Sequence, residues 1–536
     1  MQFLDLQRQY VSYREEIDTR MRRVLEHTRF VMGPEIEELE QALAARVSVA
    51  HAITTASGTA ALELSLRALE IGPGDEVIVP TFTFVASAEV IRLVGATPVF
   101  VDIEQNSFNI DPVAFAAAVT ARTKAVIAVD LYGQMADYGQ LNKLAAAHKI
   151  TVIEDAAQSF GATQNGLSSG AVTDIGTTSF FPTKTLSCFG DGGALFTNDD
   201  AVAERVRELR THGGQGFNYQ YIGTNARFDT IQAAVILAKL PHFDGEISRR
   251  QHLAARYSEA LGDVCHVPSV VSGNTHVFTP YTVRLDHRDR ICALLRERGV
   301  PVAIYYPRCL HEQPAYAAYA TSENFPEGEL ASREVISLPL YPFLTESEQD
   351  CVISGLRDVI AEVNNNWNFN PSIPMGIVTD VMEPCDCCQP DLEIDENGNV
   401  YVAYRNNIQN LRDTYLSVKR FNEDGFYENY QVSNFQEFIP YCPSSGPDID
   451  IKEDEIAVAY TIYDNQKVYT SISNLNEINF SDFMNVSDSN SKQNHPYISL
   501  DENILVVWAD YINNNSGNWE IYFAVRDLET NEMVNI

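Results

Sequence analysis

The sequence predicts an α/β protein built on a mostly parallel sheet, followed by a separate all-β region. Three observations support this fold class. Apolar strand-like runs alternate with amphipathic helical patterns up to about residue 362, an Asn/Pro-rich stretch then interrupts that pattern, and a multi-strand unit recurs beyond it. Because 536 residues are too many for one ordinary hydrophobic core, we expect two to four domains.

The strand-like runs of the first two-thirds are continuously apolar. They include DEVIVP, TPVFVDI, KAVIAVDLYG and ITVIEDAA. Helical patterns such as PVAFAAAVT and YGQLNKLAAAHK separate them. Continuous apolar strands between helices are typical of a parallel sheet covered on both faces. We expect this sheet in a large domain over residues 1–240.

A smaller α/β unit follows the large domain. After RQHLAARYSEAL the pattern changes to the strand-like runs YTVRL and VAIYY, and it closes on the helix TESEQDCVISGLRDVIAEV. We assign residues 241–363 to this small domain. The stretch NNNWNFNPSIP, residues 364–374, is rich in turn-forming residues and is interpreted as a linker.

Residues 375–536 repeat one plan. The segments PDLEIDENGNVYVAYRNN, PDIDIKEDEIAVAY and HPYISLDENILVVWAD each combine a short strand, an acidic turn and a second apolar strand. A third strand follows each of them: TYLSVKR, KVYTSIS and EIYFAVR. A spacing of roughly 50 to 57 residues with several strands per unit is typical of β-propeller blades. Closed propellers have about four to eight blades, so we expect a partial β-propeller of about three blades.

Charge and hydropathy exclude some classes of function. The formal net charge of -35 argues against nucleic acid as a partner. The N-terminus, MQFLDLQRQYVSYREEIDTRMRR, lacks the apolar run of a secretory signal, and no stretch is long enough to span a bilayer. We therefore expect a cytoplasmic protein without membrane insertion. The scattered cysteines fit reduced thiols in that compartment: Cys188, Cys265, Cys292, Cys309 and Cys351.

A second group of cysteines is crowded in the all-β region. It consists of Cys385, Cys387 and Cys388, with Cys442 following. A metal site that takes Cys442 as its fourth ligand, a disulfide to Cys442 and unpaired thiols are all compatible with this spacing. Because the spacing matches no standard zinc motif, we assign no metal site.

The first segment that carries chemistry is ITTASGTAALELSL. A strand leads here through Ser57-Gly58-Thr59 into a helix. A small-residue turn at a helix N-terminus presents backbone N–H groups and the helix dipole to an anion, typically a phosphate. The alternative is a turn that only caps the helix.

The second segment is ITVIEDAAQSFGA. Asp155 is expected at the C-terminal end of an apolar strand, where ligands bind in open α/β sheets. A carboxylate in that position can keep a heterocyclic nitrogen protonated, because an adjacent anion favours the charged form. The alternative is a helix N-cap.

The third segment is SFFPTKTLSCFGDGG, which places Lys184 among aromatic residues, a proline and glycines. A lysine partly desolvated by Phe180, Phe181 and Pro182 has a depressed pKa and can form an imine with an aldehyde. The alternative is a lysine that extends to solvent.

Together the three segments fit pyridoxal 5′-phosphate. This cofactor needs a phosphate site, an acid at its pyridine nitrogen, a lysine for its aldehyde and usually a ring on its face. Thr59 and Ser179 can bind the phosphate, Asp155 the nitrogen and Lys184 the aldehyde, while Phe84 in VPTFTFVASA can stack on the ring.

Residues 1–362 resemble the DegT/DnrJ/EryC1/StrS sugar aminotransferases along their entire length. The resemblance implies the aspartate-aminotransferase-type fold, with a large cofactor-binding domain and a smaller second domain. It also implies a homodimer whose active sites are shared across the interface. The matching motifs are FLDL, GPEIEELE, SGTAAL, GPGDEVIVPTFTFVAS, GATPVFVDI, LYGQ, VIEDAAQSFGA, SFFPTKTLSCFGDGG and RFDTIQAA.

The resemblance also implies roles for individual residues. Lys184 is the lysine linked to the cofactor aldehyde, Asp155 the partner of the pyridine nitrogen, and Gln158 a neighbour of the ring hydroxyl. Asn225, in YIGTNARFD, reaches the phosphate in the neighbouring subunit. The complete cofactor-binding set is Gly58, Thr59, Phe84, Asp155, Gln158, Ser179, Lys184 and Asn225, and the substrate-side residues are Arg227, Tyr306 and His311.

Within this family the sequence is especially similar to enzymes that aminate C3 of a UDP-linked 2-acetamido-3-keto-hexuronic acid. Those enzymes use L-glutamate as donor in surface polysaccharide (O-antigen and lipopolysaccharide) synthesis. LYGQMADY and SLPLYPFL carry part of this likeness. One departure is Arg308-Cys309, where the family commonly has a proline before Leu-His, and Arg308 is either an anion contact or an exposed charge.

Three alternatives to this function are compatible with parts of the sequence. One is amination of another UDP- or dTDP-linked 3- or 4-keto sugar. The second is a non-catalytic protein that binds the cofactor. The third is a dehydratase of the same fold, which has histidine at the lysine position, and Lys184 argues against it.

The region from about residue 375 resembles sialidase-like or BNR-like propeller proteins through EPCDCCQPDLEID and YCPSSGPDIDI. It lacks an S-x-D-x-G-x-x-W turn motif, so we expect a binding or structural module rather than a sialidase. A second interpretation is an unrelated sequence fused to the enzyme.

Overall fold

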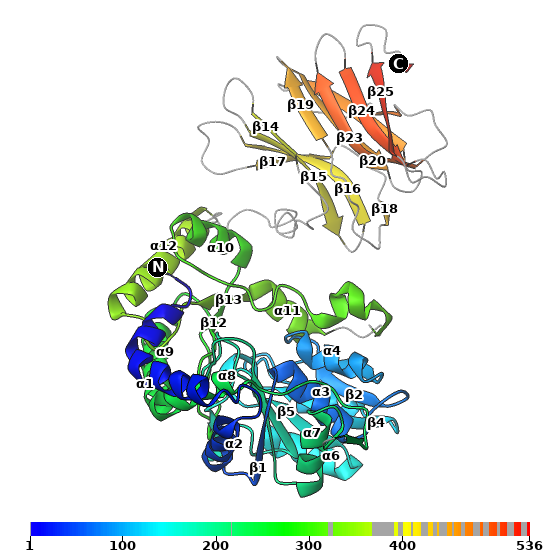
Figure 1. Cartoon of the computed structure of the whole chain (residues 1–536). Coiled ribbons are helices and arrows are strands. Elements are labelled where there is room, and N and C mark those ends of the chain that lie inside the picture. Colours follow the sequence, from blue (N-terminus) through cyan, green and yellow to red (C-terminus); the bar gives the residue numbers. More distant parts are fainter. Residues whose placement is uncertain are drawn as a thin grey trace. The chain divides into compact units, whose positions relative to one another are not determined.

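The computed structural model describes residues 2–215, 217–319 and 325–366, and beyond them the strands named below. The chain divides into two units, Met1–Trp367 and Asn368–Ile536 (Figure 1). Within the described residues, no helix has both the length and the apolar character needed to cross a bilayer.

A seven-stranded sheet forms the centre of the first unit, with strand order β1-β9-β8-β5-β4-β2-β3. Strand β9 runs antiparallel to both of its neighbours, and the other neighbouring strands are parallel. The predicted mostly parallel sheet is therefore confirmed. Its strands are β1 (His51–Thr55), β2 (Glu76–Pro80), β3 (Thr97–Val101), β4 (Thr123–Val129), β5 (Thr151–Asp155), β8 (Ile175–Ser179) and β9 (Gly193–Thr197).

Each central strand is apolar on both faces because each face supports a separate core. On β2, Val77 and Val79 belong to one buried cluster and Ile78 to the other. Successive side chains of a strand point to opposite faces, so a strand covered on both sides needs a continuous apolar run. Helices α3, α4 and α7 contribute to the first cluster, and α2, α5, α6 and α8 to the second.

Helices occur along the whole length of the first unit. In chain order they are α1 (Leu6–His27), α2 (Pro34–Val47), α3 (Gly58–Ala68), α4 (Ala86–Leu93), α5 (Pro112–Ala118), α6 (Tyr138–His148), α7 (Asp200–Leu209), α8 (Thr230–Lys239), α9 (Phe243–Leu261), α10 (Arg288–Glu297), α11 (Pro326–Glu334) and α12 (Glu346–Asn366). Short 3₁₀ turns lie at Leu131–Gly133, Leu240–His242, Leu310–Glu312 and Pro314–Tyr319.

Short antiparallel pairs complete the first unit. They are β6 (Thr163–Gln164) with β7 (Leu167–Ser168), β10 (Gly214–Gln215) with β11 (Asn218–Tyr219), and β12 (Tyr281–Arg284) with β13 (Val335–Leu338). A third buried cluster joins β12 and β13 to helices α9, α10 and α12. The predicted division at residues 240 and 241 stays a prediction.

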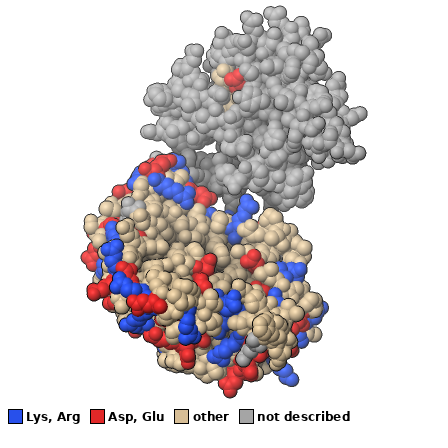
Figure 2. All heavy atoms as spheres, in the orientation of Figure 1, with Lys and Arg blue, Asp and Glu red and all other residues tan. Residues whose placement is uncertain are grey.

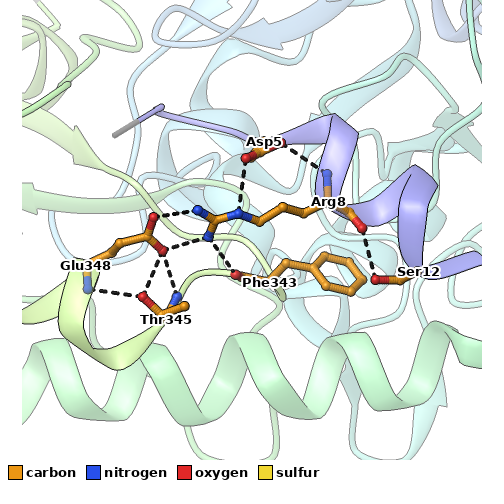
Figure 3. A network of polar contacts seen from close by, with 6 residues as sticks. All are labelled: Asp5, Arg8, Ser12, Phe343, Thr345 and Glu348. Carbon is orange, nitrogen blue, oxygen red and sulfur yellow. Dashed lines mark hydrogen bonds and ion pairs between the residues drawn. The ribbon is translucent and has the colours of Figure 1, made fainter.

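A polar network fastens the N-terminus of α1 to the beginning of α12 (Figure 3). The Arg8 guanidinium donates to both carboxylate oxygens of Glu348, each at 2.7 Å, and to the Phe343 carbonyl at 3.2 Å. Asp5 caps α1 by accepting from the Arg8 backbone N–H at 3.1 Å. A bidentate arginine–carboxylate pair of this kind fixes both position and orientation.

Replacing Glu348 with glutamine tests this network through its pH dependence. The hydrogen bond from Arg8 lowers the pKa of Glu348 to about 2. A carboxyl whose pKa is lower in the folded than in the unfolded chain adds stability above its unfolded pKa, about 4.3, and loses it as pH falls. We expect the wild type to be more stable than Glu348→Gln near neutral pH, with the difference shrinking below about pH 4.3. Urea unfolding at several pH values measures it.

The matched control is Glu346→Gln, two residues earlier on α12. Its side chain is 54% exposed and lies 3.6 Å from Arg249. The pKa of Glu346 is also lowered, mainly by a hydrogen bond from His252. Because solvent screens such exposed pairs, the difference in stability between this variant and the wild type should be much smaller than for Glu348→Gln at every pH. A difference between wild type and Glu348→Gln that is independent of pH would contradict the prediction.

Surface charges of the first unit are mixed rather than segregated. On the face seen in Figure 2, blue and red side chains are interspersed. The surface charges of this unit also form local ion pairs, such as Arg256 with Asp350 at 2.7 Å and Arg357 with Asp263 at 2.6 Å. Such pairs cancel much of the field that either charge alone would produce at a distance.

Among its described residues, the second unit contains three antiparallel sheets. The first holds β14 (Asp391–Ile394), β15 (Val400–Ile408), β16 (Leu411–Lys419), β17 (Tyr427–Gln431) and β18 (Glu437–Phe438). The second holds β19 (Asp448–Lys452), β20 (Glu455–Ile462), β21 (Lys467–Asn474) and β22 (Phe483–Asn485), and the third β23 (Lys492–Leu500), β24 (Ile504–Tyr511), β25 (Trp519–Arg526) and β26 (Met533–Asn535). Cys385, Cys387, Cys388 and Cys442 lie outside the described residues.

Candidate active site

A cavity of about 550 Å³ lies in the first unit, where strands β5 and β8 end. Its wall contains Asp155, the last residue of β5, and Ser179, the last residue of β8. Ligands bind at this edge of open α/β sheets because loops, not strands, follow it. Of the residues predicted to bind cofactor, the cavity brings together Gly58, Thr59, Phe84, Asp155, Gln158, Ser179 and Lys184.

Lys184 stands on a loop that is closed by its own backbone hydrogen bonds. The Phe180 N–H donates to the Gly192 carbonyl at 2.7 Å, and the Cys188 N–H donates to the Phe180 carbonyl at 2.8 Å. The Lys184 N–H donates to the Phe181 carbonyl at 2.9 Å. The Phe180 side chain is fully buried. The loop therefore holds Lys184 on a fixed backbone, half-buried at the cavity wall.

Lys184 and Asp155 influence each other electrostatically. Burial lowers the pKa of Lys184, and the charge of Asp155 opposes that change. Burial raises the pKa of Asp155, while hydrogen bonds from Ser87 and Ala157 and the charge of Lys184 oppose it. The pair thus combines an amine that deprotonates more readily than a surface lysine with a carboxylate whose hydrogen-bond donors oppose the rise in its pKa.

Two donors orient the Asp155 carboxylate. The Ser87 hydroxyl on α4 donates to Oδ2 at 2.9 Å, and the Ala157 backbone N–H donates to Oδ1 at 3.2 Å. Asp155 is only 6% exposed, and what remains accessible faces the cavity. A buried carboxylate held in this way is placed to accept a hydrogen bond from a ligand.

The N-terminus of α3 forms another part of the wall. Ser57 caps this helix, its hydroxyl accepting from the Ala60 N–H at 3.0 Å. The first N–H groups of a helix, here those of Gly58 and Thr59, have no acceptor within the helix. Together with the helix dipole, they make the turn a suitable phosphate site. Ser179 completes this corner from the end of β8.

Gly58 permits the close approach of α3 to the end of β8. A Cβ atom at Gly58 would lie 2.9 Å from the Ser179 Cβ and 3.4 Å from the Thr178 carbonyl oxygen. Neither is the mobile end of a long side chain. A residue larger than glycine would therefore push the helix N-terminus away from Ser179.

We expect Gly58→Ala to weaken cofactor binding by about tenfold, which corresponds to the loss of one hydrogen bond of about 1.4 kcal/mol. Titration of the apoprotein with pyridoxal 5′-phosphate measures this. The control is Gly245→Ala on α9, where a Cβ would meet nothing within 4 Å. That variant should bind cofactor like the wild type. Equal affinities of the two variants would show that the close approach at Gly58 is unimportant.

Aromatic and amide groups also line the cavity. The rings of Phe84 and Tyr306 have centroids 6.0 Å apart and are tilted by 36°. Phe84 remains 52% exposed, so its ring has a free face. The Gln158 amide accepts from the Tyr132 N–H at 2.6 Å and donates to the Tyr306 hydroxyl at 3.3 Å. Gln158 thereby holds Tyr306 at the cavity.

Three predicted residues are not among those that line the described cavity. Asn225 is exposed and pairs through its backbone with Thr211, and Arg227 is half-buried two residues later. His311 shares a 2.6 Å hydrogen bond with the Thr81 hydroxyl. Their assigned roles stay predictions.

The cavity also contains residues that motif reasoning did not select. Phe3 and Leu4 precede α1, Tyr305 precedes Tyr306, and Arg250 comes from α9. The N-terminal pair reaches the cavity because the Arg8 network fixes the start of α1. In the sequence, Arg250 was recognisable only as a polar residue on the amphipathic helix RQHLAARYSEAL, and nothing there indicated that it reaches the cavity.

The donor set fits pyridoxal 5′-phosphate. A helix N-terminus faces a polar corner that only glycine allows to close, a buried carboxylate lies at the cavity wall, and an amine of lowered pKa shares that wall. These groups match the phosphate, the ring nitrogen and the aldehyde of the cofactor.

Comparison with known proteins agrees with this fit. The model of the DegT/DnrJ/EryC1/StrS aminotransferase family matches residues 11–357. A UDP-2-acetamido-2-deoxy-3-oxo-D-glucuronate aminotransferase of Pseudomonas aeruginosa is 44% identical over 360 residues, 67% of this chain and 100% of that protein. A dTDP-3-amino-3,4,6-trideoxy-alpha-D-glucose transaminase of Streptomyces venezuelae is 41% identical, covering 66% of this chain and 95% of that protein.

A solved structure extends the comparison to three dimensions. NtdA from Bacillus subtilis, with bound cofactor PMP, has a TM-score of 0.63 and 32% identity. The matched region covers 67% of this chain and 85% of the NtdA chain. The first unit thus has the fold of aminotransferases that bind this cofactor.

Proposed function

The chain belongs to the DegT/DnrJ/EryC1/StrS aminotransferase family, and from this premise we propose that it aminates a nucleotide-linked keto sugar. The proposed acceptor position is C3 of a UDP-linked 2-acetamido-3-keto-hexuronic acid, the donor is L-glutamate, and the product enters surface polysaccharide synthesis. The cofactor is pyridoxal 5′-phosphate. The observation that carries the proposal is one cavity shared by Lys184, Asp155 and the α3 N-terminus.

When bound, the cofactor supplies an aldehyde that accepts amines and a ring that withdraws electrons. Lys184 provides the attachment point and, once released, a general base. Its pKa is lowered by burial, so its neutral form is more accessible and can take the proton from the donor Cα. Asp155 keeps the ring nitrogen protonated through its negative charge.

The remaining residues are assigned to binding. Gly58, Thr59 and Ser179 bind the phosphate, and Phe84 and Gln158 contact the ring and its hydroxyl. Tyr306 faces the same cavity and is proposed to contact the sugar. Arg227 and His311 are proposed on the substrate side from their match to the family motifs alone.

We further propose a homodimer in the cytoplasm with shared active sites, to which Asn225 contributes a phosphate contact in the neighbouring subunit. Asn225 is exposed, as a contact across an interface requires in the free protomer. Large apolar side chains are exposed on the same unit: Phe30, Val31, Phe84, Phe181, Phe189 and Phe217. Where such side chains form one contiguous patch, they are typical of an association surface.

The test is a panel of UDP- and dTDP-linked 3- and 4-keto sugars, each incubated with L-glutamate and the purified protein. Amination of the UDP-3-keto-hexuronic acid in preference to the others supports the proposal. Preference for another sugar assigns that substrate instead. If no sugar is aminated while glutamate still converts the cofactor to its amine form, the acceptor assignment is wrong.

For the second unit we propose a partial β-propeller that serves as a binding or structural module. In each of the three described sheets consecutive strands pair antiparallel, and in the first sheet β18 pairs with β16 instead of β17. The first strand of each sheet contacts the first strand of the next, β14 with β19 and β19 with β23, as at the centre of a propeller. Deleting residues 368–536 should leave the amination rate unchanged, and a large loss of rate would assign this unit a part in catalysis.

A further inference from the structure

Arg250 is a buried cation at the candidate active site that the proposed reaction does not yet use. It lies on α9 and is 4% exposed. It lines the same 550 Å³ cavity as Lys184, and both residues also line a small neighbouring cavity. Its position therefore places a guanidinium group in the wall of the cavity that also contains the reacting amine.

One edge of the Arg250 guanidinium is not used by the described protein. Nη1 donates to the Leu340 carbonyl at 3.2 Å and to the Phe278 carbonyl at 3.4 Å. Nε is buried and has no partner among the described residues. No described residue accepts a hydrogen bond from Nη2 either. Nε and Nη2 form the side of the guanidinium that binds a carboxylate in bidentate fashion.

The charge of Arg250 is not neutralised by an ion pair among the described residues. The acidic residue that acts on the pKa of Arg250 is Glu246, one turn earlier on α9. The Glu246 carboxylate accepts a hydrogen bond from the Gln9 amide at 3.1 Å. Burial lowers the pKa of Arg250 to about 10, and Glu246 opposes this. Arg250 therefore stays charged at neutral pH, and a buried charge of this kind is costly unless an anion or strong hydrogen bonds compensate it.

We propose that Arg250 binds a carboxylate of a substrate inside the cavity through its Nε and Nη2 edge. The inference rests on the proposed function, because both proposed substrates carry this group. L-Glutamate brings an α-carboxylate next to the amine that reacts, and the hexuronic acid brings the carboxylate of its C6. A planar, bidentate donor suits either of them better than a lysine would.

The experiment compares Arg250→Lys and Arg250→Met with the wild type in the two half-reactions. Conversion of the cofactor by L-glutamate is followed by absorbance. Amination is followed from enzyme already loaded with the amino group, using the keto-hexuronic acid and the same sugar without its C6 carboxylate. We expect the KM for one carboxylate-bearing substrate to rise by about 10- to 100-fold in both variants, the loss of one charged hydrogen-bonded pair.

The two arms identify the source of the carboxylate. A rise in KM that is confined to L-glutamate assigns Arg250 to binding of the amino donor. A rise confined to the hexuronic acid, and absent for the sugar without C6 carboxylate, assigns it to the acceptor. Calorimetric titration of the holoenzyme with glutarate gives a readout independent of turnover, and we expect weaker binding by the variants if the donor is bound.

The matched control is Arg249→Lys on the same helix. Arg249 also donates to a backbone carbonyl, that of Leu344 at 3.4 Å, but its charge faces Glu346 rather than the cavity. It should leave both half-reactions unchanged. If Arg250→Lys folds and both KM values and glutarate binding stay within about twofold of the wild type, the proposal is overturned.

A crystal structure of the wild-type holoenzyme with glutarate or the keto sugar decides the question without a variant. A carboxylate on Nε and Nη2 supports the proposal, and a carboxylate bound elsewhere refutes it. Failure of the proposed function can be distinguished from either of these two crystallographic results. In that case no keto sugar is aminated by the wild type, whereas the glutamate and glutarate arms still report on Arg250.

Discussion

Lys184→Ala is expected to lower the amination rate by about 10³- to 10⁴-fold, the range typical of a lost general base. The variant loses both the covalent attachment point and the amine of lowered pKa at the cavity wall. Steady-state turnover with L-glutamate and the preferred keto sugar measures the rate. Borohydride reduction followed by peptide mapping should fix the cofactor to Lys184 in the wild type and leave the variant unlabelled.

The matched control is Lys239→Met, which removes another buried lysine. Lys239 donates to the Ser187 carbonyl at 2.8 Å and to the Gln9 amide oxygen at 2.9 Å, and it is not among the residues that line the described cavity. That variant should be less stable, yet its cofactor should still be fixed at Lys184. Labelling of a different lysine in the wild type would show that the active-site lysine has been misassigned.

Asp155→Asn is expected to lower kcat by about 10³-fold while cofactor binding changes far less. An amide is similar in size to a carboxylate but carries no charge, so the ring nitrogen would no longer be kept protonated. The effect therefore falls on proton removal from the donor rather than on attachment of the cofactor. Single-turnover conversion of the cofactor by glutamate measures it.

Ser87→Ala separates the charge of Asp155 from its orientation. The Ser87 hydroxyl donates to Asp155 at 2.9 Å and lowers the pKa of that carboxyl. Its removal should raise the pKa, so the acid limb of the pH–rate profile should move to higher pH, with a rate loss of about tenfold or less. If Asp155→Asn and the wild type have the same rate, the charge of Asp155 has no catalytic part.

Local pattern was enough to predict the elements that carry the proposed chemistry. The continuous apolar run ending at Asp155 predicted a buried parallel strand, and Asp155 is the last residue of β5. The small-residue turn at Ser57 predicted a strand-to-helix junction, and Ser57 is the N-cap of α3. These features depend on period, capping and strand ends, all of which are written within a few adjacent residues.

Residues whose position depends on distant segments were not accessible in this way. Arg250 reaches the cavity because α9 packs against the segments that end at Phe278 and Leu340, whose carbonyls hold its Nη1. Phe3 and Leu4 reach it because Arg8 pairs with Glu348, far away in the sequence. No spacing rule relates such positions, since their contacts form only when separate elements pack.

The sequence by itself determined which segments form the strands of the sheet and predicted a pyridoxal-type site, because both follow from local pattern and from motif likeness. Only the tertiary structure decided how that site is enclosed. It placed Gly58 against Ser179 at a distance that excludes a Cβ, and it left one edge of Arg250 unpaired in the wall. Close packing and the pairing of buried charges depend on the distances between elements, which a linear pattern does not contain.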